Sequence, residues 1–365
     1  MLKDFEKEIA NFFGTEHAIV TGSGRIALQI ALQSFELSEG NVIVPNLICS
    51  MVPQTIISTG LTPLLVDLNK DLSLNVDVLE NEVNQNTKVL LVNYLYGCPT
   101  DDIKKLMIYL KDKNMLIIED VAQAFGLKIK GKYAGTFGDF GILSFPKLFF
   151  PFFRGGAIIT NDEKLARRAY SIRKKTQTKP NLFYIMAEYI YYRSMKHLPK
   201  VLKKRLTSIN TTPRDSTKLY ERKETSSPYH LQNLTNFETM IGIQTLHNLK
   251  RLIVSRQKII EKIYSIILNS NNLHLKPLFP YRDDYLYFRI PVFVKNASIQ
   301  KWRNSFYKQG EIINMIYRPL SNNTLLRHKC VLLKDYSNSE YLSANLLPLP
   351  VTPNVIKILK KLDTT

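Results

Sequence analysis

Short apolar runs alternate with amphipathic helical stretches along the first half of the chain. The runs carry few charges, as expected for strands buried on both faces of a parallel sheet. This alternation predicts an α/β fold in which helices flank a mostly parallel, seven-stranded sheet. The predicted strands are residues 17–21, 41–45, 62–67, 88–94, 115–120, 140–145 and 157–160. The helices expected between them are 25–34, 52–59, 76–84 and 100–113.

The pattern changes after Lys164. A basic helical stretch at 165–175 is followed by an apolar and aromatic run at 182–192, which is well short of the ~20 residues that span a bilayer. The polar segment 207–227 is typical of a loop, and 236–267 predicts one or two long helices. Beyond Pro277 we expect strands at 285–293 and 311–317 and helices at 298–309 and 354–362.

These patterns divide the 365 residues into two domains. Residues 1–235 are predicted to form a large α/β domain that carries a basic, aromatic-rich insertion at about 177–227. Residues 236–365 are predicted to form a connecting helix and a smaller C-terminal α/β domain.

Positive charge is concentrated in one segment of the chain. Thirteen Lys or Arg residues lie between Lys164 and Arg205 against one acidic residue, Glu188, within a formal net charge of +19. An anionic partner and a solvated basic face explain this equally well. A basic, aromatic-rich helix of this kind is able to lie in a membrane interface, although packing against its own domain or a partner subunit is commoner. Nucleic acid is disfavoured because no helix-turn-helix or base-stacking motif is evident.

Cysteine and histidine usage predicts a reduced compartment and no metal site. The three cysteines are scattered without metal-type spacing, and none of the six histidines pairs at ligand spacing. The N-terminal residues are polar and helical in pattern, so we expect no signal peptide and a cytoplasmic protein.

An acid and an amine that follow two predicted strands are the most informative residues for function. Asp120 ends the strand at 115–120, and Lys147, the only lysine between Gly135 and Asp162, follows the strand at 140–145. Pyridoxal phosphate (PLP) chemistry needs an aspartate that keeps a pyridine nitrogen protonated and a lysine amine that forms a Schiff base. Each residue alone also fits a common structural role, as a helix cap and as a surface lysine. We expect both at the carboxyl edge of the sheet, where α/β proteins bind ligands.

A turn of small residues, Gly22-Ser23-Gly24, separates the first predicted strand from the first helix of the sheet. Small residues let the backbone approach a phosphate, and a helix N-terminus adds N–H donors and partial positive charge. The turn also fits the G-x-G-x-x-A pattern of dinucleotide sites. However, the second strand ends in Pro45-Asn46-Leu47, without the acidic residue that such sites need. We therefore expect a phosphate site here, and a purely structural turn is the alternative.

Motifs along nearly the whole chain resemble the DegT/StrS-type sugar aminotransferases, a family of PLP fold type I. The blocks 119–124 (Glu-Asp-Val-Ala-Gln-Ala) and 134–139 (Ala-Gly-Thr-Phe-Gly-Asp) are close to the family's most specific motifs. Residues 94–97 resemble its H-L-Y-G, and 155–162 follow in register. Residues 346–350 are similar to its final L-P-L-H block. The resemblance implies the fold type I architecture.

The resemblance also implies roles for individual residues. Asp120 would pair with the pyridine nitrogen of PLP and Gln123 with the phenolic oxygen, while Lys147 would form the Schiff base and move the proton. The cofactor phosphate would be bound by residues of the first turn and of a later strand end, namely Ser23, Gly24, Arg25 and Ser144. Tyr317 and Arg318 lie near a late family motif and are candidate substrate residues.

Enzymes of this type pass an amino group from glutamate to a keto sugar attached to a nucleotide, in cell-surface glycan or secondary-metabolite biosynthesis. They are usually homodimers. The resemblance therefore implies an amino-acid donor and a nucleotide-sugar acceptor as partners. One alternative is a PLP-dependent sugar dehydratase, although resembling members of that branch replace the lysine with histidine. Another is a catalytically inactive binding or regulatory protein of the same fold.

Four features depart from the family pattern. The loop Ser144-Phe145-Pro146-Lys147 is two residues shorter than the common S-F-x-P-T-K, and Arg25 replaces a threonine. Leu47 and Cys49 stand where aromatic residues are expected, and the insertion at 177–227 is much longer than the usual loop. We expect these departures to affect substrate binding most, and the basic insertion suggests peripheral contact with an anionic membrane.

Overall fold

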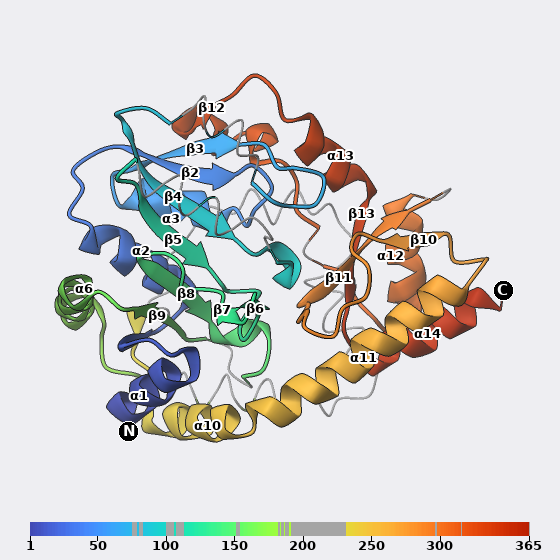
Figure 1. Cartoon of the computed structure of the whole chain (residues 1–365), viewed down its shortest axis with the longest axis horizontal. Coiled ribbons are helices and arrows are strands. Elements are labelled where there is room, and N and C mark those ends of the chain that lie inside the picture. Colours follow the sequence, from blue (N-terminus) through green and yellow to red (C-terminus); the bar gives the residue numbers. More distant parts are fainter. Residues whose placement is uncertain are drawn as a thin grey trace.

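A large sheet and a small sheet organise the chain, and a long helix connects them (Figure 1). The computed structural model describes residues 1–74, 79, 83–99, 106, 113–150, 154–181, 183, 186, 190, 231–295, 298–314 and 316–364. Most of the helices predicted at 76–84 and 100–113, and most of the insertion at 177–227, lie outside these residues.

The large sheet has the strand order β1-β9-β8-β5-β4-β2-β3-β12. Neighbouring strands are parallel except at β9, which runs antiparallel to both β1 and β8. The strands are β1 (His17–Thr21), β2 (Asn41–Pro45), β3 (Thr62–Val66), β4 (Thr87–Asn93), β5 (Leu116–Asp120), β8 (Phe140–Ser144), β9 (Gly156–Thr160) and β12 (Val331–Leu332). The predicted α/β fold is confirmed, and each of the seven predicted strands is present with its bounds within one residue.

The predicted strand number of seven was wrong, because the sheet has an eighth strand. β12 comes from the C-terminal part of the chain and pairs in parallel with β3 through only two residues. The Tyr336 hydroxyl donates to the carbonyl of Leu65 in β3 and fastens the same segment to the sheet edge. A two-residue strand has no alternation to read, so its pairing depends on tertiary contacts alone.

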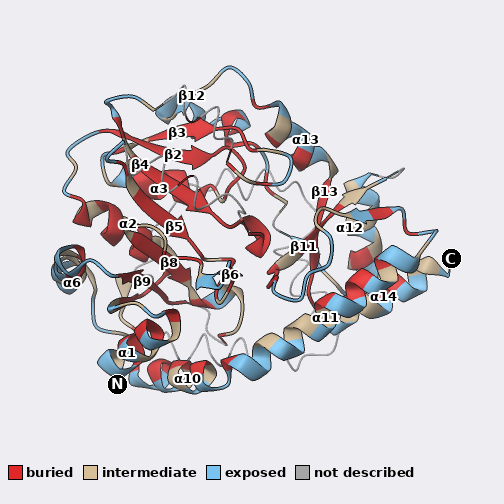
Figure 2. Ribbon diagram, in the orientation of Figure 1, coloured by how far each residue is buried: buried red, intermediate tan, exposed pale blue. Residues whose placement is uncertain are grey.

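Both faces of the large sheet are covered, as the uncharged strands predicted (Figure 2). In β2, Val42 and Val44 belong to one core cluster and Ile43 to the other, as the two-residue period of a strand requires. The first face packs against α2 (Gly24–Ser34), α3 (Met51–Ser58) and α6 (Glu163–Thr176). Residues of α1 (Leu2–Phe13) and α10 (Asn236–His247) contribute to the cluster on the other face.

The C-terminal unit is built on an antiparallel sheet of order β10-β11-β13. Its elements are α11 (Leu249–Asn269), β10 (Leu275–Pro277), β11 (Arg289–Val294), α12 (Ile299–Lys308), α13 (Ser337–Asn345), β13 (Leu346–Pro350) and α14 (Pro353–Asp363). The two halves of the predicted long helix are α10 and α11. Short elements elsewhere are β6 (Lys128–Ile129), β7 (Lys132–Tyr133) and the 3-10 turns η1 (Leu95–Gly97), η2 (Phe145–Lys147), η4 (Leu320–Asn322) and η5 (Arg327–Lys329).

The strand predicted at 311–317 was wrong for the described residues of that segment. Ile313 and Tyr317 are buried and Asn314 is exposed. The central strand β11 is already paired on both sides, with β10 and β13. The segment is therefore buried by side-chain contacts without joining a ladder. Within the described parts of the chain, no helix has the length and apolar content needed to cross a membrane.

Candidate active site

A cavity of about 310 Å³ lies at the carboxyl edge of the large sheet, where β4, β5 and β8 end. Eight of the nine residues predicted for the site line it, namely Ser23, Gly24, Arg25, Asp120, Gln123, Ser144, Lys147 and Tyr317. The ninth, Arg318, is exposed and is not part of the lining. Residues far apart in the sequence thus meet because parallel strands end at one edge.

The small-residue turn forms one wall of the cavity. Ser23 is the N-cap of α2, and its Oγ accepts from the backbone N–H of Ile26 at 3.2 Å. A Cβ at Gly24 would lie 3.0 Å from the Cβ of Ser144 and 3.2 Å from the carbonyl oxygen of Leu143. Glycine therefore lets the first turn of α2 rest against the end of β8. The N-terminus of α2, with its backbone amides and positive dipole end, therefore borders the cavity, as an anion site requires.

Arg25 follows on the same turn and is half-buried against the cavity. Burial lowers the pKa of its guanidinium, while the nearby Cys49 opposes this shift. Cys49 itself lines the cavity, at the position where the sequence comparison expected an aromatic residue. The cavity wall at this position therefore carries a small thiol instead of an aromatic ring.

Asp120 ends β5 with its carboxylate in the cavity wall. Its Oδ1 accepts from the backbone N–H of Ala122 at 3.0 Å, and its Oδ2 accepts from Nδ2 of Asn93 at 2.8 Å. Burial raises the pKa of the Asp120 carboxyl, and the two hydrogen bonds and the charge of Lys147 act in the opposite direction. No helix follows Asp120 in the described residues 121–127, so the helix-cap interpretation was wrong; the carboxylate closes a turn with Ala122 and lines the cavity.

Gln123 connects the two parts of the chain across the cavity. Its Oε1 accepts from the backbone N–H of Tyr96 at 3.0 Å, and its Nε2 donates to the Tyr317 hydroxyl at 2.9 Å. The segment after Tyr317 is held on the large sheet, where the N–H groups of Leu320 and Ser321 donate to Asn46. Tyr317 is therefore a fixed part of the wall although it lies almost 200 positions after Gln123.

Lys147 ends the 3-10 turn η2 directly after β8 and is half-buried. The preceding Phe145 is fully buried, and its ring packs against those of Phe5 and Phe150, with centroids 5.4 and 4.8 Å away. The packed rings of Phe145 and Phe150 thus anchor the segment that carries Lys147. Lys147 is the only amine-bearing side chain among the described residues that line the cavity.

The acid before Asp120 has a different task. Glu119 is fully buried and accepts from the Tyr94 hydroxyl at 2.5 Å and from the backbone N–H groups of Gly135, Phe137 and Gly138. Burial raises the pKa of the Glu119 carboxyl, and these donors oppose the shift. The two motif blocks at 119–124 and 134–139 are therefore in contact, and Glu119 fixes the loop that precedes β8.

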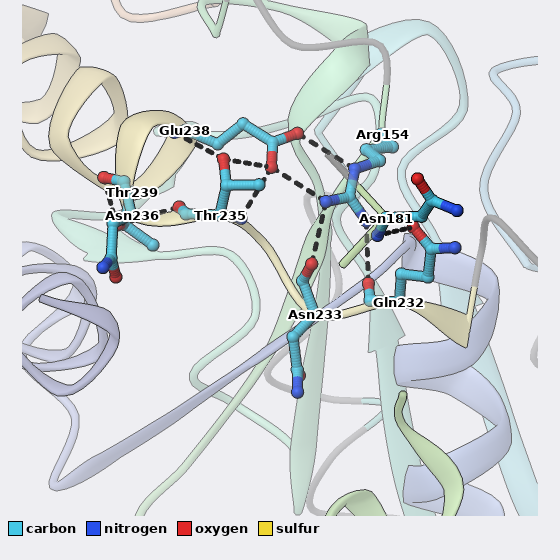
Figure 3. A network of polar contacts seen from close by, with 8 residues as sticks. All are labelled: Arg154, Asn181, Gln232, Asn233, Thr235, Asn236, Glu238 and Thr239. Atoms are coloured by element: carbon cyan, nitrogen blue, oxygen red, sulfur yellow. Dashed lines mark hydrogen bonds and ion pairs between the residues drawn. The ribbon is translucent and has the colours of Figure 1, made fainter. Parts of the chain in front are cut away.

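The sequence analysis missed Arg154, a fully buried arginine in the cavity wall. Its guanidinium donates to both carboxylate oxygens of Glu238 at 2.8 and 2.9 Å, and to the carbonyls of Gln232 and Asn233, each at 2.8 Å (Figure 3). Glu238 also completes the capping box of α10 with Thr235. Arg154 thus ties the strand entry before β9 to the start of α10.

The sequence held one weak signal for Arg154, which is its place directly before Gly155. In the structure the N–H of Gly155 donates to the carbonyl of Gly22 in the predicted phosphate turn. Gly155 has a φ of +95°, a backbone region that favours glycine. A lone arginine in a basic chain is ordinarily a surface residue, and its acidic partner lies 84 positions later.

Comparison with known proteins places this geometry in a family. A GDP-perosamine synthase of Escherichia coli O157:H7 is 36% identical over 170 residues, which are 46% of this chain and 46% of the relative. The alignment thus spans about half of either protein.

Solved structures match over almost the full length of the chain. An Escherichia coli GDP-4-keto-6-deoxy-D-mannose-3-dehydratase with bound hydrated PLP superposes with a TM-score of 0.73 and 20% identity, covering 100% of this chain and 90% of that chain. A putative sugar aminotransferase of Streptococcus pneumoniae in its PMP form gives a TM-score of 0.74 and 21% identity, covering 100% and 92%. At these identities the likeness concerns the fold. The sequence model of the DegT/DnrJ/EryC1/StrS aminotransferase family matches residues 1–357, so the chain belongs to this family.

Proposed function

We propose that this protein is a PLP-dependent aminotransferase. It moves an amino group from an amino acid to a nucleotide-linked keto sugar, and glutamate is the proposed donor. The observation that carries the proposal is the meeting of Asp120, Lys147 and the N-terminus of α2 around one cavity. Family membership and the name of the perosamine synthase relative support the reaction class.

The residues present fit PLP. Asp120 offers a buried carboxylate for a ring nitrogen, and Lys147 offers an amine in the same cavity. The close approach of Gly24 to β8 leaves a helix N-terminus for the phosphate, with Ser23, Arg25 and Ser144 beside it. When bound, the cofactor would supply an electron sink for the bonds at the carbon that bears the amino group.

The chain's own residues would then divide the work. Asp120 would hold a proton on the ring nitrogen, and Gln123 would contact the ring oxygen. Nζ of Lys147 would accept the proton from Cα of the donor amino acid and deliver it to the cofactor carbon to which the amino group passes. Over the full cycle the donor becomes a 2-oxo acid and the keto sugar becomes an amino sugar.

Spectroscopy of the purified protein with PLP tests the assignment. Borohydride should fix the cofactor covalently to Lys147, identified by mass spectrometry of peptides, and glutamate should change the absorption band before reduction. Lys147→Ala should abolish the covalent product and amino transfer. An active Lys147→Ala variant would refute the role of Lys147, and a wild type that binds no PLP would favour an inactive member of the family. An acceptor sugar that loses a hydroxyl without gaining nitrogen would indicate the dehydratase reaction instead.

We also propose that the enzyme is a cytoplasmic homodimer that contacts anionic membranes through its basic insertion. The charge concentration between Lys164 and Arg205 supports the membrane contact. So does the exposure of Phe183 and Met186, whose surfaces are 79% and 61% accessible. Flotation with phosphatidylserine vesicles tests the contact, and absence from the vesicle fraction at low salt would refute it. Light scattering after gel filtration tests the dimer.

A further inference from the structure

Asn93 and Asp120 end neighbouring strands and lie directly opposite each other in the register of β4 and β5. Both side chains line the cavity, and both residues are only 9% exposed. Nδ2 of Asn93 donates to Oδ2 of Asp120 at 2.8 Å. Since a carboxylate only accepts hydrogen bonds, this contact fixes the orientation of the amide.

The other amide atom of Asn93 makes no such contact. Within the described part of the chain, its Oδ1 is buried and has no hydrogen-bond partner. A buried acceptor without a partner destabilises a fold, and an apolar side chain of similar shape would avoid the cost. Stability alone therefore does not explain an asparagine at this strand end.

The contacts of Asp120 indicate what the asparagine does. The backbone N–H of Ala122 donates only to Oδ1 of Asp120. This single hydrogen bond leaves the plane of the carboxylate free to rotate unless the second oxygen is also held. Asn93 provides that second contact from the adjacent strand, which is rigidly placed by the β4–β5 ladder. The plane of the carboxylate is thereby set by two donors from two directions.

We propose that Asn93 is a positioning residue of this site, whose amide holds the Asp120 carboxylate in the plane that pairs with a cofactor ring nitrogen. The inference rests on the proposed function. It assigns to the end of β4 a role in cofactor binding, and it makes Asn93 act through Asp120 rather than on the substrate.

Asn93→Leu tests the proposal, because leucine keeps the approximate shape and removes both the donor and the unpartnered oxygen. The dissociation constant of PLP is measured by titrating the cofactor-free protein, and Tm of the cofactor-free protein is measured in parallel. We expect the dissociation constant to rise about 10- to 100-fold, the worth of a hydrogen bond to a charged group. Loss of the donor to Asp120 and removal of the unpartnered Asn93 oxygen act in opposite directions on stability, so we expect Tm to change by less than about 2 °C.

Asn41→Leu is the matched control. Asn41 is 8% exposed and begins β2, so it lies at the amino ends of the parallel strands, away from the cavity at their carboxyl ends. Its replacement should leave the PLP dissociation constant within about twofold of the wild type. If Asn93→Leu is not recovered folded, Asn93→Val, whose branched side chain suits a strand, is measured in the same way. If neither variant folds, the role of Asn93 is structural and the proposal is overturned.

The remaining outcomes also separate cleanly. A wild type that binds no PLP refutes the proposed function and this inference together. A wild type that binds PLP while Asn93→Leu binds it equally well refutes the inference alone. A weaker affinity accompanied by a comparable loss of Tm in the cofactor-free protein indicates a structural role and also refutes it.

Discussion

Replacing Arg154 by methionine should destabilise the protein strongly, because it leaves the Glu238 carboxylate buried without its cation. In the wild type the Arg154 side chain is fully buried and the Glu238 side chain is 11% exposed. The substitution removes two hydrogen bonds to the carboxylate and two to backbone carbonyls. The Thr235 N–H and hydroxyl remain on Glu238, but they carry no full charge.

The expected size follows from other buried ion pairs. Removing one partner typically costs about 3–5 kcal/mol. An unfolding entropy of about 2.1 cal/mol/K per residue over 365 residues corresponds to a shift of about 1.3 °C per kcal/mol if the chain unfolds cooperatively. Tm of the cofactor-free Arg154→Met protein should therefore fall by about 4–7 °C in scanning calorimetry.

Two further variants make this test selective. Glu238→Gln combined with Arg154→Met removes the buried charge as well as its partner, so the double variant should lose less than the sum of the single losses. Arg167→Met is the control, because Arg167 is 78% exposed and its pair with Glu163 is a surface pair worth less than about 1 kcal/mol. A loss below about 1 °C in Arg154→Met, or full additivity in the double variant, would refute the reasoning.

Three other predictions follow from the same geometry. Gly24→Ala should weaken PLP binding roughly tenfold. The new Cβ would stand 3.0 Å from the Cβ of Ser144 and push the first turn of α2 away from β8. An unchanged PLP dissociation constant would contradict this. Tyr94→Phe should lower the free energy of unfolding by about 1–3 kcal/mol, since the fully buried Glu119 loses its hydroxyl donor, and denaturant titration measures the loss. Asp120→Asn should stabilise the cofactor-free protein at neutral pH. Burial raises the pKa of the Asp120 carboxyl in the fold, so the wild type loses stability as the pH rises from the unfolded value of 3.8 through the folded pKa. The difference in Tm between variant and wild type should therefore shrink as the pH is lowered toward 4, and a difference that grows would contradict the sign.

The sequence supported the local parts of this picture because they depend on short-range patterns. Strands such as β1 and β2 were predicted with their observed bounds, since uncharged apolar runs between helical stretches are typical of buried parallel strands. Asp120 and Lys147 were predicted as site residues because polar residues at the ends of such runs lie at the edge of a sheet where α/β proteins bind ligands, and both line the cavity. Asn93 stood inside the strand predicted at 88–94, and its partnership with Asp120 was missed because strand register cannot be read from one strand.

Only the tertiary structure decided the contacts that join distant segments. β12 pairs with β3 through two residues, too few for any periodic signal. Arg154 finds Glu238 across 84 positions, and Gln123 meets Tyr317 across 194. Hydrophobic periodicity reports which face of an element is buried, so the sequence by itself determined the fold class. Polar residues at the ends of the predicted strands indicated the edge of the sheet where the cavity lies. Buried polar pairing depends on which donor and acceptor reach the same place after folding, and that was settled by packing.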